Sequence, residues 1–253
     1  MELRLAHLYP ELMNTYGDRG NVLTLMRRAA WRGIEVQLRG IGVGEPVDPD
    51  VHDLYFFGGG QDREQGLVAD DLVSCKGDGL RTAVEQGAVV LAICGGYQLL
   101  GREFRTGSGA VLPGIGVLDV WTEAGERRHI GNAVVRCGWA GPNRLLVGFE
   151  NHSGKTYLGV GCQPLGRSEV GAGNNGEDGM EGARYRDIYA CYLHGSLLPK
   201  NPWFADHLLQ RALLRRYGPD VTLAALDDRL EVAAQHSVLE RVRRVGRAAL
   251  GVQ

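Results

Sequence analysis

Short apolar runs alternate with helical patterns along the first half of the chain. Apolar runs of strand length that end at glycine or polar residues predict buried strands. We expect strands at residues 3–8, 34–38, 53–57 and 88–93. Helical patterns follow at about 21–33, where Asn21 is the expected N-cap, and at about 67–86. Strands separated by helices are typical of a parallel sheet with right-handed crossovers.

The second half has a different pattern. It predicts strands with few helices between them, at residues 115–121, 130–136, 145–149 and 187–193. We expect these strands to extend the sheet in an antiparallel manner. The glycine-rich stretch 165–184 predicts a hairpin or surface loop, and helices return at 203–217 and 227–249. We therefore expect one domain over residues 1–217 and a C-terminal helical extension, 218–253, packed on it.

Composition narrows the class of protein. The chain has 253 residues, of which 44% are apolar and 23% are charged, and its net charge is −2, as expected for a soluble globular protein. Four arginines near the C-terminus lie at helical spacing, which fits a solvated helix face, so we predict no nucleic-acid partner. These are Arg241, Arg243, Arg244 and Arg247. The sequence has no signal-peptide pattern and no apolar run of membrane-spanning length, so we expect a cytoplasmic protein that is not embedded in a membrane.

The cysteines carry a more specific signal. The chain has 5 cysteines and no C-x-x-C pair, so neither a disulfide framework nor a metal site is expected. Cys94 stands out because it follows the buried run 88–93 and precedes Gly95, Gly96 and a short helical pattern. A cysteine on such a turn faces a helix N-terminus, which favours the thiolate, and free backbone N–H groups lie nearby. The alternative is a tightly packed cysteine with no chemical role.

A thiolate nucleophile needs a histidine to move protons. The chain has 7 histidines. His194 is preferred because it ends a predicted strand and is followed by Gly195, so it reaches the same sheet edge as Cys94 if the two strands run in the same direction. His129 and His152 lie in polar stretches and are weaker possibilities.

A run of glycines forms the third element of the predicted site. Gly58, Gly59 and Gly60 follow the strand at 53–57 and offer bare backbone N–H groups at the sheet edge. Such a loop cradles a phosphate or an oxyanion, or simply turns the chain. No nucleotide-binding glycine motif occurs in the sequence, so the oxyanion interpretation is favoured.

Together these segments resemble a known family. The Cys-Gly-Gly-Tyr-Gln-Leu-Leu-Gly turn at 94–101, Gly-Gly-Gly-Gln-Asp at 58–62 and Tyr-Leu-His-Gly at 192–195 resemble class I glutamine amidotransferases of the cobyric-acid-synthase-like branch. The resemblance implies a flavodoxin-like, three-layer α/β fold with a mixed central sheet and helices on both faces. It also implies that the enzyme hydrolyses L-glutamine through a thioester and releases ammonia.

Longer motifs narrow the resemblance to the GatD family, the small subunits of lipid II isoglutaminyl synthases. They lie at 9–10, 14–21, 128–132, 148–152, 173–176 and 194–202. The resemblance implies a separate partner, a MurT-like Mur ligase that activates the D-glutamate α-carboxyl of the peptidoglycan stem peptide. ATP and Mg²⁺ are then expected in that partner, and no cofactor is expected in this chain.

The family roles transfer to individual positions. Cys94 matches the nucleophile, His194 the catalytic histidine and Arg128 the arginine that binds glutamine. A guanidinium suits that role because it pairs bidentately with the α-carboxylate of glutamine, although a plain surface arginine is the alternative. Further substrate-binding candidates are the N–H groups of Gly59, Gly60 and Gly95 and the side chain of Gln98, which otherwise packs.

One position departs from many class I enzymes. They carry an acid two residues after the histidine, whereas this chain has Ser196 there. We therefore expect this chain alone to offer a Cys–His pair, and we hypothesise that the partner supplies an acid. Three rivals stay open: amidation of a corrinoid side chain, a cysteine peptidase of the same architecture, and an inactive regulatory module.

Overall fold

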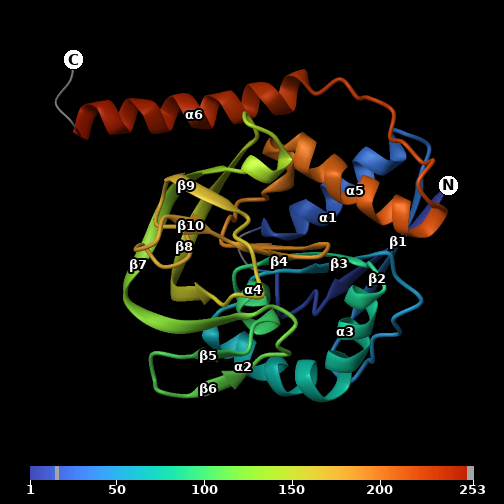
Figure 1. Ribbon diagram of the computed structural model, residues 1–253, viewed down its shortest axis with the longest axis horizontal. Helices are drawn as coiled ribbons and strands as arrows, with labels where there is room; N and C mark the ends of the chain where they lie inside the picture. Colours follow the sequence, from blue (N-terminus) through green and yellow to red (C-terminus); the bar gives the residue numbers. More distant parts are fainter. Residues whose placement is uncertain (15–16, 250–253) are drawn as a thin grey trace.

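The computed structural model describes residues 1–14 and 17–249, apart from the side chains of Asp62 and of residues 245–249. Thr15 and Tyr16, which belong to the motif at 14–21, lie outside the described residues, as does the side chain of Arg247. In this part of the chain the strands form two sheets with helices packed around them (Figure 1).

The first sheet has the strand order β11-β12-β4-β3-β1-β2. Its strands are β1 (Glu2–Leu8), β2 (Glu35–Ile41), β3 (Leu54–Phe57), β4 (Val89–Ile93), β11 (Ala183–Tyr185) and β12 (Ile188–Cys191). All neighbours are parallel except β11 and β12. Strands β3 and β4 are buried along their whole length, as expected for apolar strands covered on both faces. The predicted fold class is confirmed.

Helices cover both faces of this sheet (Figure 1). On one face lie α1 (Arg19–Ala30) and α5 (Pro202–Tyr217), and on the other lie α2 (Asp62–Asp71), the π-helical turn η2 (Leu72–Lys76), α3 (Gly77–Glu85) and α4 (Gly95–Leu100). The predicted N-cap of α1 is wrong, because Asp18 occupies that position. Asn21 lies buried inside the helix, where its Oδ1 accepts a hydrogen bond from the backbone N–H of Leu198 at 2.9 Å.

The predicted antiparallel extension is wrong, since most of the later strands form a second sheet of order β10-β9-β7-β5-β6, with β8 paired to β7. Its strands are β5 (Glu103–Arg105), β6 (Val111–Pro113), β7 (Val120–Arg136), β8 (Leu145–Leu158), β9 (Gly166–Val170) and β10 (Met180–Glu181), and the short helix η3 (Gly138–Ala140) joins β7 to β8. Of the predicted strand at 115–121, only residues 120 and 121 lie in a strand, at the start of β7. The N–H groups of Ile115 and Leu118 instead bond to carbonyls at the end of α4.

The C-terminal helices are confirmed as α5 and α6 (Arg229–Ala249). Helix α6 lies across one end of the molecule (Figure 1) and contacts η4 (Leu198–Lys200), β7 and β8. Buried Arg28 of α1 pairs with Asp206 of α5 and Asp228 before α6, at 2.7 Å each. The domain boundary after residue 217 stays a prediction.

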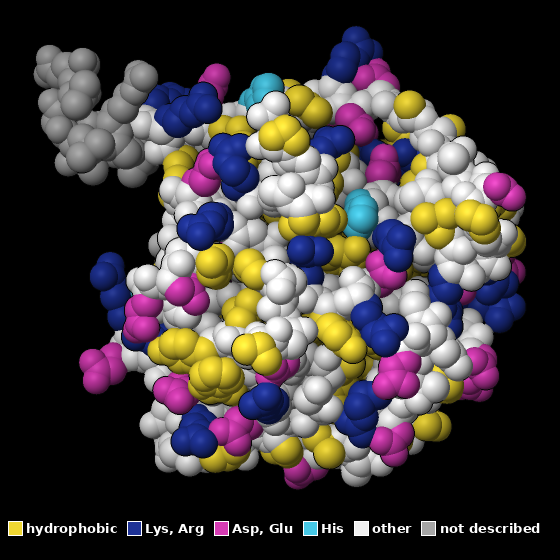
Figure 2. Space-filling model, viewed as in Figure 1, with side chains coloured by type: hydrophobic (Ala, Val, Ile, Leu, Met, Phe, Trp, Pro, Cys, Tyr) yellow, Lys and Arg dark blue, Asp and Glu magenta, His cyan; other side chains and the backbone are white. Residues whose placement is uncertain are grey.

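The surface and the helices bear on possible partners. On the face shown in Figure 2, basic and acidic side chains are interspersed, with no continuous block of one sign. None of the helices within the described ranges is both long and apolar enough to cross a bilayer.

Candidate active site

Cys94 lies on a sharp turn between β4 and α4. Its backbone angles are φ 50° and ψ −105°, which cost about 1–3 kcal/mol for a residue with a side chain. The turn is possible because its neighbours are glycines: a Cβ on Gly96 would lie 2.6 Å from the carbonyl oxygen of Phe57. The sulfur-bearing side chain is thus held at the carboxyl edge of the sheet.

His194 lies beside Cys94. Strand β12 runs parallel to β4, with Cys191 opposite Ile93, and the N–H of Cys94 donates to the carbonyl of Cys191 at 2.8 Å. The chain leaves both strands at the same sheet edge, which meets the condition set by the sequence. The side chains of Cys94 and His194 interact directly, and this interaction helps to set the charge of the imidazole.

A carboxylate completes the arrangement. Asp18 Oδ1 lies 3.2 Å from His194 Nδ1, and Asp18 Oδ2 accepts a hydrogen bond from the N–H of Gly59 at 2.8 Å. The prediction that this chain alone offers only a Cys–His pair is therefore wrong. The acid comes from the loop that precedes α1 and occupies the Nδ1 side of the ring, so the geometry does not require an acid from a partner.

The charge state of His194 follows from these neighbours. Burial lowers the pKa of His194, but the charge of Cys94 and the hydrogen bonds with Asp18 and Cys94 outweigh burial and raise the pKa to about 10. The imidazolium form therefore persists until the pH rises through about 10. A positively charged imidazole beside Cys94 would stabilise negative charge on the sulfur of an attacking cysteine.

The glycine donors divide into two groups. The N–H of Gly59 is already bonded to Asp18, so its predicted role as an oxyanion donor is wrong. Gly60 lines the pocket beside Cys94, and a Cβ on Gly95 would lie only 2.9 Å from the backbone nitrogen of Gly60. Gly60 and Gly95 thus bring their backbones together next to Cys94, and their assignment as oxyanion donors stays a prediction.

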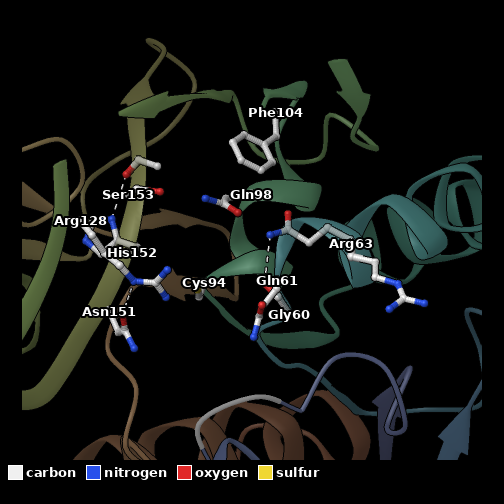
Figure 3. A pocket seen from close by; sticks show the side chains of 12 residues that line it. Gly60, Gln61, Arg63, Cys94, Gln98, Phe104, Arg128, Asn151, His152 and Ser153 are labelled. Carbon is white, nitrogen blue, oxygen red and sulfur yellow. Dashed lines mark hydrogen bonds between the residues drawn. The ribbon is translucent and has the colours of Figure 1, made fainter. Parts of the chain in front are cut away.

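A cavity of about 310 Å³ opens beside Cys94 (Figure 3). Its walls come from both halves of the molecule: Gly60, Gln61 and Gln98 on one side, Arg128, Asn151 and His152 on the other. Arg128 reaches in from β7, and its Nε donates to Asn151 Oδ1 of β8 at 2.7 Å. This bond fixes the orientation of a guanidinium that suits the carboxylate of a small substrate.

Gln98 is held by a chain of buried hydrogen bonds. Its Nε2 donates to the Tyr192 hydroxyl at 3.0 Å, which in turn bonds to Thr156 at 2.6 Å. Among the residues that the structure describes, the buried Oε1 of Gln98 has no hydrogen-bond partner. Gln98 is therefore fixed with an acceptor to spare, which fits the predicted contact with a substrate amide.

Two of the other histidines, His152 and His7, are buried in settings that do not suit a base. His152 lines the same cavity, but its ring stacks on Tyr192 at 3.8 Å between centroids, and its Nδ1 bonds to the Gly154 carbonyl at 2.9 Å. Burial lowers the pKa of His152 to about 4, and likewise that of His7 to about 4. Both are neutral near pH 7, and neither is placed as the base.

A two-way backbone contact joins the two sheets next to the site. The N–H of Phe149 on β8 donates to the carbonyl of His194 at 3.2 Å, and the N–H of His194 donates back to the carbonyl of Phe149 at 2.8 Å. Asn151, the partner of Arg128, lies two residues further along β8. Strand β8, which carries the hydrogen-bond partner of Arg128, is thus bonded directly to His194.

Comparison with known proteins agrees with this geometry. Residues 4–202 match the model of the CobB/CobQ-like glutamine amidotransferase domain. The chain belongs to the CobB/CobQ-like glutamine amidotransferase family. It is therefore a glutamine-hydrolysing enzyme by family.

Two relatives are similar along almost their whole length. The subunit GatD of lipid II isoglutaminyl synthase from Staphylococcus aureus is 39% identical over 96% of this chain and 97% of that protein. The same subunit from Streptococcus pneumoniae is 39% identical over 93% of this chain and 91% of that protein. The resemblance to the GatD family is confirmed. Cobyric acid synthase from Pelotomaculum thermopropionicum is 33% identical over 69% of this chain but only 34% of that protein.

Solved structures support the fold. The glutaminase domain of CTPS from Trypanosoma brucei, solved with bound acivicin, has a TM-score of 0.54 at 11% identity and covers 88% of this chain and 96% of that one. PurLQS from Thermotoga maritima has a TM-score of 0.52 at 16% identity and covers 83% of this chain and 99% of that one. Both show the same overall arrangement of helices and strands.

Several site residues were not assigned from the sequence. Asp18, Asn151 and Gln65, whose Nε2 bonds to the Gly60 carbonyl at 3.1 Å, are all part of the site or its support. A signal for Asp18 existed, because its loop follows β1 and therefore leaves the same edge of the parallel sheet as Cys94. The sequence motif contained the residue, but only the fold shows that it faces His194.

Proposed function

We propose that this chain is the glutaminase subunit of a lipid II isoglutaminyl synthase. It hydrolyses L-glutamine and supplies the ammonia to a MurT-like ligase, which amidates the D-glutamate α-carboxyl of lipid II during peptidoglycan synthesis in the cytoplasm. The observation that carries the chemistry is Cys94 in a strained turn beside His194, at a cavity into which an arginine held by Asn151 reaches. The acceptor is supported by the near full-length similarity to the two GatD subunits.

The residues suggest a two-stage reaction. The Cys94 thiolate attacks the side-chain amide carbon of glutamine, and the N–H groups of Gly60 and Gly95 stabilise the oxyanion. His194 gives its Nε2 proton to the amide nitrogen, the C–N bond breaks, and ammonia leaves a thioester. The neutral imidazole then takes a proton from water, the hydroxide attacks the thioester, and the C–S bond breaks to restore the thiolate–imidazolium pair and release glutamate.

In this proposal, Arg128 and Gln98 recognise the substrate glutamine. The guanidinium of Arg128 pairs with the α-carboxylate of glutamine, and Gln98 Oε1 accepts from the side-chain amide. The cavity volume of about 310 Å³ suits a free amino acid rather than a polypeptide segment, which favours glutaminase over peptidase activity. In this proposal, ATP and Mg²⁺ are bound by the ligase and not by this chain.

The test separates ammonia production from ammonia use. The protein is combined with its Mur-ligase-like partner, ATP, Mg²⁺ and lipid II, and amidated lipid II is measured with either glutamine or ammonium chloride as the nitrogen source. The Cys94→Ala variant is expected to lose all glutamine-dependent amidation and to keep the ammonium-dependent reaction, because only the nucleophile is missing.

Two results would contradict the proposal. Glutamine hydrolysis that survives in Cys94→Ala would refute the nucleophile. Amidation of a corrinoid carboxylate, with no amidation of lipid II from either nitrogen source, would move the protein to another pathway.

A further inference from the structure

Asp18 makes two hydrogen bonds that no simple packing role requires. Its side chain is fully buried, at 0% exposure. One carboxylate oxygen faces His194 Nδ1 at 3.2 Å, and the other accepts the N–H of Gly59 at 2.8 Å. A buried carboxylate is costly unless it is paired and hydrogen-bonded, so its presence here needs an explanation.

We propose that Asp18 is the positioning residue of the site, which holds the His194 ring in the tautomer whose Nε2 faces Cys94 and at the same time fixes the glycine loop beside the nucleophile. This inference rests on the proposed glutaminase function. It assigns the orienting acid to this chain itself, in a loop 176 residues away from the histidine in sequence.

Close packing leaves these groups little freedom. A Cβ on Gly59 would lie 2.8 Å from His194 Cε1, 3.1 Å from Asp18 Oδ2 and 3.4 Å from the Cβ of Cys94. Acid, base and nucleophile therefore surround one glycine, which must lack a side chain for them to meet. Because one carboxylate bonds both the ring and this glycine, a shift of Asp18 moves the base and the loop together.

The loop that carries Asp18 is attached to the segment that carries His194. The Ser196 hydroxyl donates to the Gly17 carbonyl at 2.7 Å, and the Leu198 N–H donates to Asn21 at 2.9 Å. Gly20 packs against Ser196 so closely that a Cβ there would lie 2.0 Å from its hydroxyl oxygen. These contacts set the distance between the two segments, while the carboxylate sets the orientation of the ring.

Other ionisable groups face His194 but do not replace this contact. Cys94 also interacts with the ring through its side chain, but it carries a thiol and no carboxylate. Glu181 of β10 is buried, its pKa is raised to about 8 mainly by burial, and its Oε1 accepts the Tyr192 N–H at 2.6 Å. His152 of β8 is held neutral by burial. Asp18 is thus the carboxylate in direct hydrogen-bond contact with the ring in the described part of the chain.

The experiment compares Asp18→Asn with the wild type, alone and with the ligase partner, by steady-state glutamine hydrolysis across pH. An asparagine keeps the shape, but its NH2 group opposes either the ring N–H or the Gly59 N–H. We expect kcat to fall on the order of 10²- to 10⁴-fold, as for loss of the orienting acid elsewhere, with KM changed by less than about threefold because Arg128 is untouched. In the wild type, kcat should fall as the pH rises through about 10, where His194 loses its proton. In Asp18→Asn this fall should occur at a pH lower by about 1 to 3.

Ser196→Ala is the matched control, because it loosens the same loop without removing the carboxylate. It is expected to lower the melting temperature slightly, to keep kcat within about threefold and to leave the pH at which kcat falls unchanged. The positioning role would be overturned if Ser196→Ala lost as much kcat as Asp18→Asn. It would also be overturned if Asp18→Asn kept the wild-type kcat and the wild-type pH dependence.

A second measurement does not depend on a folded Asp18 variant. In ¹⁵N-histidine-labelled wild-type protein, with His194→Asn used to assign the signal, Nδ1 of His194 should carry a proton throughout pH 6–9. An unprotonated Nδ1 in that range contradicts the proposal. Absence of glutaminase activity in the wild type, alone and with the ligase, would instead contradict the proposed function, so the two failures are distinguishable.

Discussion

The two sheets contribute to the site in different ways. The first sheet carries the proposed nucleophile, the proposed base and the carboxylate that contacts the base: Cys94, His194 and Asp18 are 8%, 1% and 0% exposed and lie at its carboxyl edge. The second sheet carries Arg128, the proposed substrate-binding residue, which is an exposed side chain on the β7–β8 pair. In this proposal, the reaction takes place at buried residues that packing holds rigid. Substrate recognition depends instead on a solvent-exposed side chain of the β7–β8 pair. Substitutions in the first region should change turnover, and those in the second should change substrate affinity.

Of the three substitutions that compare the two regions, Gly96→Ala in the turn of the first sheet is expected to have the largest combined effect on stability and turnover. The new Cβ would lie 2.6 Å from the Phe57 carbonyl oxygen and 2.9 Å from that of Gly58, and backbone atoms cannot move aside cheaply. We expect unfolding to become easier by about 1–3 kcal/mol. Displacement of Cys94 should lower kcat by about 100-fold. Thermal unfolding and glutamine hydrolysis measure both, and an unchanged kcat would show that the turn tolerates more freedom than its geometry indicates.

An intermediate effect is expected from Arg128→Ala in the second sheet. Loss of a charge-assisted contact to the substrate carboxylate costs about 1.5–3 kcal/mol, so KM should rise by about 10- to 150-fold. The value of kcat should change far less, because the reacting groups are untouched. The decisive readout is the division between kcat and KM. A fall in kcat with an unchanged KM would contradict the idea that the second sheet acts on substrate affinity and the first on turnover.

The smallest effect is expected from Asn151→Ala, which removes the acceptor that holds Arg128 Nε at 2.7 Å. The guanidinium stays present but loses this hydrogen bond. A single hydrogen bond is worth about 0.5–1.5 kcal/mol, so KM should rise by only about 2- to 13-fold. The double variant with Arg128→Ala should show no further rise, and an additive effect would mean that Asn151 touches the substrate itself.

Sequence reasoning succeeded where a local pattern determines the structure. The apolar run before Cys94 and the glycines after it identified the turn, and the strand that ends before His194 placed both residues at one edge. Parallel strands share a direction, so this conclusion needed no distant contact. The strands of the first sheet other than β11 were found for the same reason.

It failed where the outcome depends on contacts between distant segments. The bond from Asp18 to His194 joins residues 176 positions apart, and no periodicity encodes it. The Gly59 N–H donates to the same carboxylate. Because this contact was not predicted, the oxyanion role predicted for Gly59 did not account for it. The separation of β5–β10 into their own sheet likewise depends on which strands pair, which alternation alone does not specify.

The backbone contact between Phe149 and His194 has a consequence for how this site can change over time. Both of its hydrogen bonds use main-chain atoms, so every non-proline residue at position 149 can make them. The distance between Arg128 and His194 is therefore set by backbone hydrogen bonds and not by particular side chains. Side chains on the β7–β8 arm are free to diverge and select a different small molecule, while the reaction at the first sheet keeps its alignment.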